Sequence, residues 1–106
     1  MTDNHFSQPQ LEAAVRAKLA VLLRMPFEDL LALPATSSTA FSEGPRPAEV
    51  WTYVDREAQD AVRFVAQISS PDAPGSRFSQ VYSEGFRRWA DGRAEPVSTP
   101  EIYEFM

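Results

Sequence analysis

Apolar residues recur at helical spacing close to the N-terminus. Successive members are four, four and three residues apart, which places them on one face of an α-helix: Leu11, Val15, Leu19 and Leu22. Ser7 and Gln10 form a capping-box pattern at the start of this stretch, and Pro26 disfavours helical backbone at the residue before it. The pattern predicts a helix over residues 8–24 whose apolar stripe packs against a sheet.

A second, shorter helix is expected directly after Pro26. Glu28 and Asp29 would stand in its first turn, where negative charge interacts favourably with the helix dipole. The helix should end before Pro34, because the residue that precedes a proline avoids helical backbone. Its buried side is expected to consist of Phe27, Leu30, Leu31 and Leu33.

The hydrophobic period changes from 3.6 to 2 in the middle of the chain. Residues 50–54 and 61–68 are rich in β-branched and aromatic residues, which favours two antiparallel strands with the polar residues 55–60 as their hairpin connection. Residues 36–41 are expected to form a short edge strand. In the run over 61–68, one apolar face is formed by Val62, Phe64, Ala66 and Ile68.

The C-terminal third predicts further strands. Residues 78–90 are expected to form a long strand, with Gly85 as a candidate bulge or bend. Asp91 and Gly92 give the strongest hairpin signal in the chain, a two-residue turn that leads into a short strand over residues 93–97. Three later apolar residues are expected to dock back onto the body of the domain: Ile102, Tyr103 and Phe105.

These elements predict an α+β fold. An N-terminal helix and a short second helix would pack on one face of an antiparallel meander of three to five strands. Residues 1–106 are expected to form a single domain, with residues 1–6 as a mobile tail. The order of elements is similar to the cystatin-like arrangement of one helix cradled by a meander, a likeness of architecture that carries no motif and implies no specific function.

The composition excludes several chemistries. The longest apolar run, Leu19–Leu23, is far shorter than the roughly 20 residues that cross a bilayer, so no membrane partner is expected. The chain has no cysteine and a single histidine, His5, on the polar N-terminal segment; no catalytic residue, cofactor or metal site is therefore expected. Without cysteines or a secretory leader pattern, the expected compartment is the cytoplasm. Three acids fall in the expected turn and are interpreted as solvated: Asp55, Glu57 and Asp60.

Charge points to another protein as the partner. The formal net charge is −5, which disfavours nucleic acid because affinity for phosphate depends on cationic contacts. Residues 34–60 carry a local balance of −3, whereas residues 77–94 carry +2 and interleave arginine with aromatic residues, two types that protein interfaces enrich. The expected partner-binding residues are Arg77, Arg87, Trp89 and Arg93.

Two classes of function remain open. The first is a small cytoplasmic protein-interaction domain without a catalytic set, such as an adaptor, an inhibitor or immunity-like protein, or a chaperone-like protein. The alternative is a small-molecule-binding or enzymatic domain with an aromatic pocket between helix and sheet, lined by Trp51, Tyr53, Phe64 and Trp89. The acids that could meet across strands in such an enzyme are Glu49, Asp55, Glu84 and Glu95. The small size and the missing catalytic set favour the first class, so the protein is not expected to be an enzyme.

Overall fold

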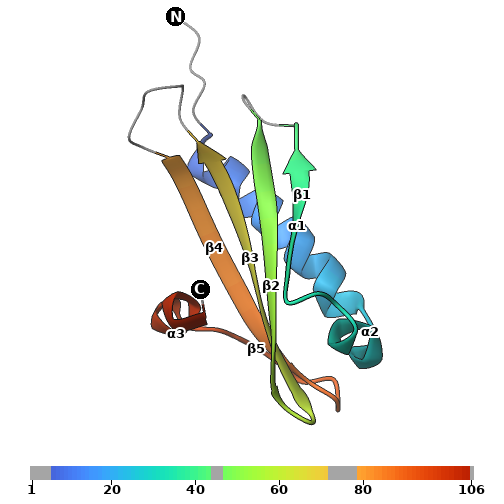
Figure 1. Cartoon of the computed structure of the whole chain (residues 1–106). Coiled ribbons are helices and arrows are strands. Elements are labelled where there is room, and N and C mark those ends of the chain that lie inside the picture. Colours follow the sequence, from blue (N-terminus) through green and yellow to red (C-terminus); the bar gives the residue numbers. More distant parts are fainter. Residues whose placement is uncertain (1–5, 44–46, 72–78, 106) are drawn as a thin grey trace, which may run out of the picture.

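A long helix lies across one face of a five-stranded antiparallel sheet (Figure 1). The computed structural model describes residues 6–43, 47–71 and 79–105. In chain order the elements are α1 (Gln8–Arg24), α2 (Phe27–Leu31), β1 (Thr36–Phe41), β2 (Ala48–Ala58), β3 (Ala61–Pro71), β4 (Ser79–Trp89), β5 (Ala94–Pro96) and α3 (Thr99–Phe105). The strands follow one another in the sheet in the order of the sequence, which makes it a meander. The predicted α+β class, with both helices and the antiparallel sheet, is confirmed.

The ends of α1 follow from local sequence signals. The Ser7 hydroxyl accepts a hydrogen bond from the Gln10 backbone N–H (3.3 Å), and the Gln10 side chain accepts one from the Ser7 backbone N–H (2.7 Å). Pro9 occupies the first turn, where its missing N–H has no partner to lose. At the other end Met25 is extended (φ −71°, ψ 143°) because Pro26 follows it. The predicted helix over residues 8–24 is confirmed at both ends.

The main core lies between α1 and the sheet. The predicted stripe of α1 is buried, and the predicted apolar face of β3 meets it with Val62, Phe64, Ala66 and Ile68, none of which is exposed to solvent. From α2, only Leu30 is fully buried in this core; Leu31, which was expected to share that side, is exposed. Helix α2 has only five residues, little more than one turn, and its C-terminal leucine lies on the outer side.

A second, smaller cluster lies on the opposite face of the sheet. Val65 of β3 packs there with Val97 and Ile102, and Tyr53 packs against them. This cluster places α3 on the sheet face opposite α1 (Figure 1). The expected docking of Ile102 is confirmed, although a helix at this position was not predicted. The expected docking of Tyr103 and Phe105 concerns side chains that lie outside the described part of the structure.

The connection between β2 and β3 is shorter than expected. Residues 55–60 were expected to form the hairpin loop, but β2 continues to Ala58 and only Gln59 and Asp60 form the turn. The polar residues Asp55 and Glu57 continue the strand, and their side chains bind Arg63 of the adjacent β3 and Arg87 of β4, on the far side of β3. Asp55 and Glu57 therefore lie in a strand and not in the expected turn, although both residues are exposed to solvent as expected.

Of two glycines near the C-terminus, Gly85 has a different role from the one expected, whereas Gly92 has the expected positive φ in a different turn. Gly85 forms no bulge, since the pairing of β3 with β4 continues without a shift through Val65 and Gly85. A Cβ atom at this position would lie 2.7 Å from the backbone oxygen of Phe64, so close approach of the strands explains the glycine. Gly92 has the expected positive φ, 98°, but Asp91 does not.

The turn before β5 is consequently a three-residue loop over residues 90–92 and not a two-residue turn. Its closure is shown by two backbone hydrogen bonds, from Trp89 N–H to the oxygen of Arg93 (2.9 Å) and from Gly92 N–H to the oxygen of Trp89 (3.0 Å). A loop of this type needs positive φ only at its last residue, which Gly92 supplies.

Packing of α1 on the sheet predicts a large difference between two neighbouring substitutions. Leu19 has 2% of its surface exposed, whereas Val21 has 59%. Leu19→Ala should lower the free energy of unfolding by about 2–5 kcal/mol through the lost contacts and the cavity. The matched control Val21→Ala should change it by less than about 0.5 kcal/mol. Urea unfolding of both variants measures the difference, and similar losses would contradict the orientation of α1.

Candidate functional site

The predicted partner-binding residues lie around the C-terminal end of β4. Arg87 and Trp89 share the sheet face opposite α1, as strand alternation requires, and both are half-buried. Arg93 follows the loop after β4 and is exposed. Arg77 lies outside the described residues.

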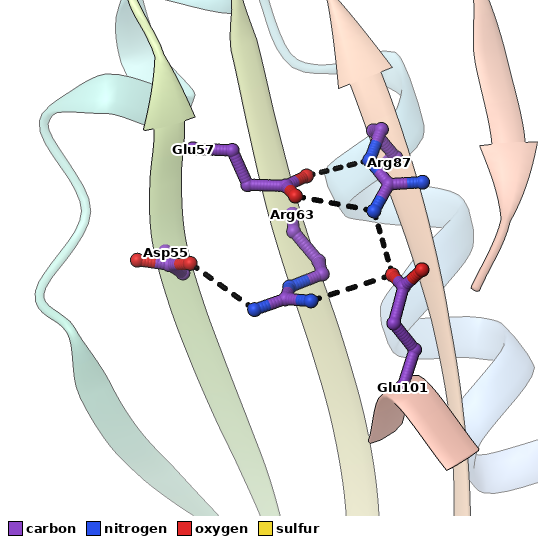
Figure 2. Close-up of polar contacts among 5 residues, drawn as sticks. All are labelled: Asp55, Glu57, Arg63, Arg87 and Glu101. Carbon is purple, nitrogen blue, oxygen red and sulfur yellow. Dashed lines mark hydrogen bonds and ion pairs between the residues drawn. The ribbon is translucent and has the colours of Figure 1, made fainter. Parts of the chain in front are cut away.

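Arg87 is held by two carboxylates of the same chain (Figure 2). Its Nε and Nη2 donate to the two carboxylate oxygens of Glu57, at 2.6 and 3.1 Å, in a bidentate pair. Nη2 also donates to Oε2 of Glu101 at 2.6 Å. Arg87, which was expected to bind a partner, thus makes its bidentate carboxylate contact within the molecule, with a residue of β2.

Arg63 extends this arrangement across β3. It donates to Oδ2 of Asp55 at 3.3 Å and to Oε2 of Glu101 at 3.4 Å. Oε2 of Glu101 therefore accepts hydrogen bonds from both Arg63 and Arg87 (Figure 2). We call the five residues the charged cluster: Asp55, Glu57, Arg63, Arg87 and Glu101. Because it joins β2, β3 and β4 to Glu101 of α3, it fastens that helix to the sheet together with the apolar contacts of Ile102.

The pKa values of Glu57 and Arg87 are shifted in the directions that an ion pair produces. The hydrogen bond from Arg87 lowers the pKa of the Glu57 carboxyl below its ordinary value of 4.5, against the smaller opposing effect of burial. The same hydrogen bond raises the pKa of the Arg87 guanidinium. A carboxylate with a lowered pKa is a weak base at neutral pH, so the cluster is better suited to holding α3 than to moving protons.

Two further arginines of the positively charged segment 77–94, Arg88 and Arg93, also have partners within the molecule. Arg88 points to the opposite face, where Nη1 donates to the backbone oxygens of Met25 (2.7 Å) and Leu23 (3.2 Å) at the C-terminal end of α1. The guanidinium of Arg93 lies 4.5 Å from the centre of the Trp89 ring, and its Nε donates to Asp91 at 3.0 Å. A partner role for Arg87, Trp89 and Arg93 stays a prediction, but the local positive charge that motivated it is largely balanced within the molecule.

The four aromatic residues suggested for a pocket do not line one space. Phe64 faces α1 and is fully buried in the main core. Trp51 and Tyr53 stack on each other on the opposite face, with ring centres 6.5 Å apart, and Trp89 lies on that face too. The candidate acids are likewise divided, because Glu84 binds Arg16 of α1 whereas Asp55 belongs to the charged cluster.

A groove does lie between α1 and the sheet, beside β1, but none of the four aromatic residues suggested for a pocket lines it. It lies between α1 and the C-terminal half of β1 and has a volume of about 450 Å³. Small side chains of α1, among them Ala13 and Ala17, form one wall, and Phe41 and Val50 contribute apolar surface from the sheet. Two charged residues, Lys18 and Glu43, also line it. The groove adjoins the outermost strand of the sheet.

The two edges of the sheet differ in how they are protected. At one edge, β5 has only three residues and contains Glu95 and Pro96, which are features that block pairing with a further strand. At the other edge, β1 has six residues, Thr36–Phe41, with no charge, proline or glycine among them. Among the described residues, no strand pairs with the outer side of β1.

The backbone groups available at this edge follow from the ladder. Val54 N–H donates to the oxygen of Ala35 (2.9 Å), directly before the first β1 pair. Hydrogen-bonded pairs alternate along an antiparallel ladder, so the N–H and C=O groups of Thr36, Ser38 and Ala40 point away from β2. The expected short edge strand over residues 36–41 is confirmed by the strand order; the contrast with the protected edge at β5 is seen only in the structure.

Comparisons of this chain with protein-family models, with curated proteins and with solved structures give no match. Within the described ranges, no group of three or more histidine, aspartate or glutamate side chains is placed to hold a metal ion. No helix in the same ranges is long and apolar enough to span a bilayer.

The lowered pKa of Glu57 predicts a pH dependence of stability. A carboxyl whose folded-state pKa is depressed stabilises the fold above its unfolded-state pKa, near 4.5, and this contribution is lost as pH falls through the folded-state pKa. As pH falls below about 4.5, the free energy of unfolding should therefore fall more steeply in the wild type than in Glu57→Gln. Glu49→Gln removes one carboxylate from an exposed position on the same strand and is the matched control in urea unfolding. Equal slopes for all three proteins would contradict the assignment.

Proposed function

We propose that this protein is a protein-interaction domain that binds an extended segment of a partner by adding it as a strand to β1. The observation that carries the proposal is the contrast between the two sheet edges: β5 is short and contains Pro96, whereas β1 offers an uncharged, unbroken edge. Exposed edges of this kind are normally blocked in proteins, because they pair readily with other chains. An edge without such protection, beside an apolar groove, suits a strand-binding site.

The backbone supplies the affinity in this mode of recognition. The outward N–H and C=O groups of Thr36, Ser38 and Ala40 would form hydrogen-bonded pairs with alternate residues of the added strand. These contacts do not depend on the partner's side chains, so specificity has to come from the surfaces beside the edge. The groove between α1 and β1 is such a surface.

The charged cluster supports a binding domain over an acid–base enzyme. Its carboxylates are committed to arginines, and the pKa of Glu57 is lowered, whereas a general base at neutral pH needs a raised one. An adaptor, an inhibitor or immunity-like protein and a chaperone-like protein could each use capture of an extended segment. A cytoplasmic location belongs to the same proposal and is supported by the cysteine-free sequence.

A proline at the edge tests the proposal. Ser38→Pro removes one outward N–H and leaves the β1–β2 ladder in place, because the Ser38 N–H points away from β2. Twelve-residue peptides selected from a random library on the wild-type protein should bind this variant at least tenfold more weakly in fluorescence anisotropy. Ser38→Ala keeps the N–H and should bind them like the wild type.

The predicted contact through Arg87 and Trp89 is tested in the same assay. If the edge of β1 is the binding site, Arg87→Ala/Trp89→Ala should retain the selected peptides, provided that its circular dichroism spectrum stays native. A folded Ser38→Pro variant with wild-type affinity would contradict strand addition. Loss of binding in the folded double variant would move the site to the opposite sheet face.

A further inference from the structure

Strand alternation determines which side chains of an added strand meet the groove. Residues of β1 whose side chains face α1 include Thr39 and Phe41, which pair with Val50 and Ala48 on the buried side of β2. Partner residues opposite Thr39 and Phe41 would point to the same side as α1. Both β1 residues line the groove, so two partner side chains, spaced two residues apart, enter it.

The walls of the groove favour large apolar side chains. The helix wall carries Ala13 and Ala17 where longer side chains would fill the space, and Val21 beside them is 59% exposed. On the sheet side, Phe41 and Val50 present apolar surface. Burial of an apolar side chain against such walls is favourable by roughly 25 cal/mol per Å² of surface removed from water. Leucine-sized side chains gain more from this groove than alanine does.

Charge gives the added strand a direction. Helix α1 begins beside the C-terminal end of β1, since the rings of Phe6 and Phe41 lie 6.1 Å apart, and the two elements run in opposite directions along the groove (Figure 1). Glu43, just after β1, therefore lies near one end of the groove, and Lys18, more than two turns into α1, lies further along it. A strand antiparallel to β1 starts at the Glu43 end and proceeds toward Lys18.

We propose that the groove between α1 and β1 selects an extended peptide segment that runs antiparallel to β1, is basic at its N-terminal end and acidic at its C-terminal end, and inserts two bulky apolar side chains at alternate positions. This inference rests on the proposed strand addition and names the chemistry of the segment. Complementary charges at the two ends exclude the reversed segment by placing like charges together.

Three peptides, blocked at both ends, test the inference by nuclear magnetic resonance titration of the labelled protein. The matching peptide is KKTLTLTEE, its small-residue control is KKTATATEE, and its reversed-charge control is EETLTLTKK. The matching peptide should bind at least tenfold more tightly than either control. Amide signals of β1 and of the α1 residues that line the groove should shift.

Two variants separate the groove from the edge. Ala17→Trp fills the groove from an exposed position of α1 and should remove the preference for leucine over alanine without weakening the alanine peptide. Glu43→Lys should weaken KKTLTLTEE and strengthen EETLTLTKK. Circular dichroism and urea unfolding confirm that both variants fold.

The outcomes distinguish selection by the groove from the proposed strand addition to β1. If Ser38→Pro weakens both leucine and alanine peptides but the wild type binds them equally, strand addition stands and groove selection is overturned. If no peptide binds up to about 1 mM, the weak end of specific recognition, both are overturned. Sedimentation could instead show a wild-type dimer that Ser38→Pro converts to a monomer. In that case β1 pairs with a second copy of the chain, and the proposal that a partner's peptide segment binds this edge is overturned.

Discussion

The width of α1 relative to the sheet decides which surfaces of this molecule stay open. An α-helix with its side chains is about 10–12 Å across, whereas five strands spaced about 4.8 Å apart span about 19 Å. The main core accordingly forms where the α1 stripe meets the central strand β3 and its neighbours. Helix α1 does not cover the outer side of β1. The groove is the space left between the surface of α1 and this uncovered strand. The groove is therefore a direct result of covering a wide sheet with one helix.

The opposite face of the sheet is covered by different means. There the short helix α3 is held by Ile102, packed on Val65, and by Glu101, which accepts hydrogen bonds from Arg63 and Arg87. A helix of seven residues gains little from its own backbone, so its position depends on these side chains. In the resulting charged cluster, the guanidinium of Arg87 donates its hydrogen bonds to Glu57 and Glu101, so these N–H groups are not available to a partner. Arg87, which contributes to a positively charged segment in the sequence, holds α3 on the sheet in the structure.

The parts of the fold that could be predicted from the sequence are those determined by near neighbours. Helix α1 was predicted at both ends because Ser7, Gln10 and Pro26 act within one turn of it. The end of β2 was not, because Asp55 and Glu57 continue the strand through arginines that lie 8 and 30 residues away in the chain. Less of the candidate site than of the fold could be predicted from the sequence. The roles of Arg87 and Glu57 follow from strand register, and the groove follows from the position of α1 over the sheet, neither of which has a local signal.

The uncharged edge of β1 exposes the chain to unwanted strand pairing. An exposed strand of six uncharged residues promotes association with any chain that can pair with it, and selection normally opposes this with charges or prolines, as at β5. The net charge of −5 keeps copies of the chain apart at long range, but salt screens it beyond about 10 Å, and it does nothing once two edges meet. Removing the hazard would require only one charged residue among Thr36, Ser38 and Ala40, whose side chains face away from the main core. That such a change is absent is explained if the edge has a ligand, because a charge at Ser38 would stand in the middle of the strand that the ligand joins.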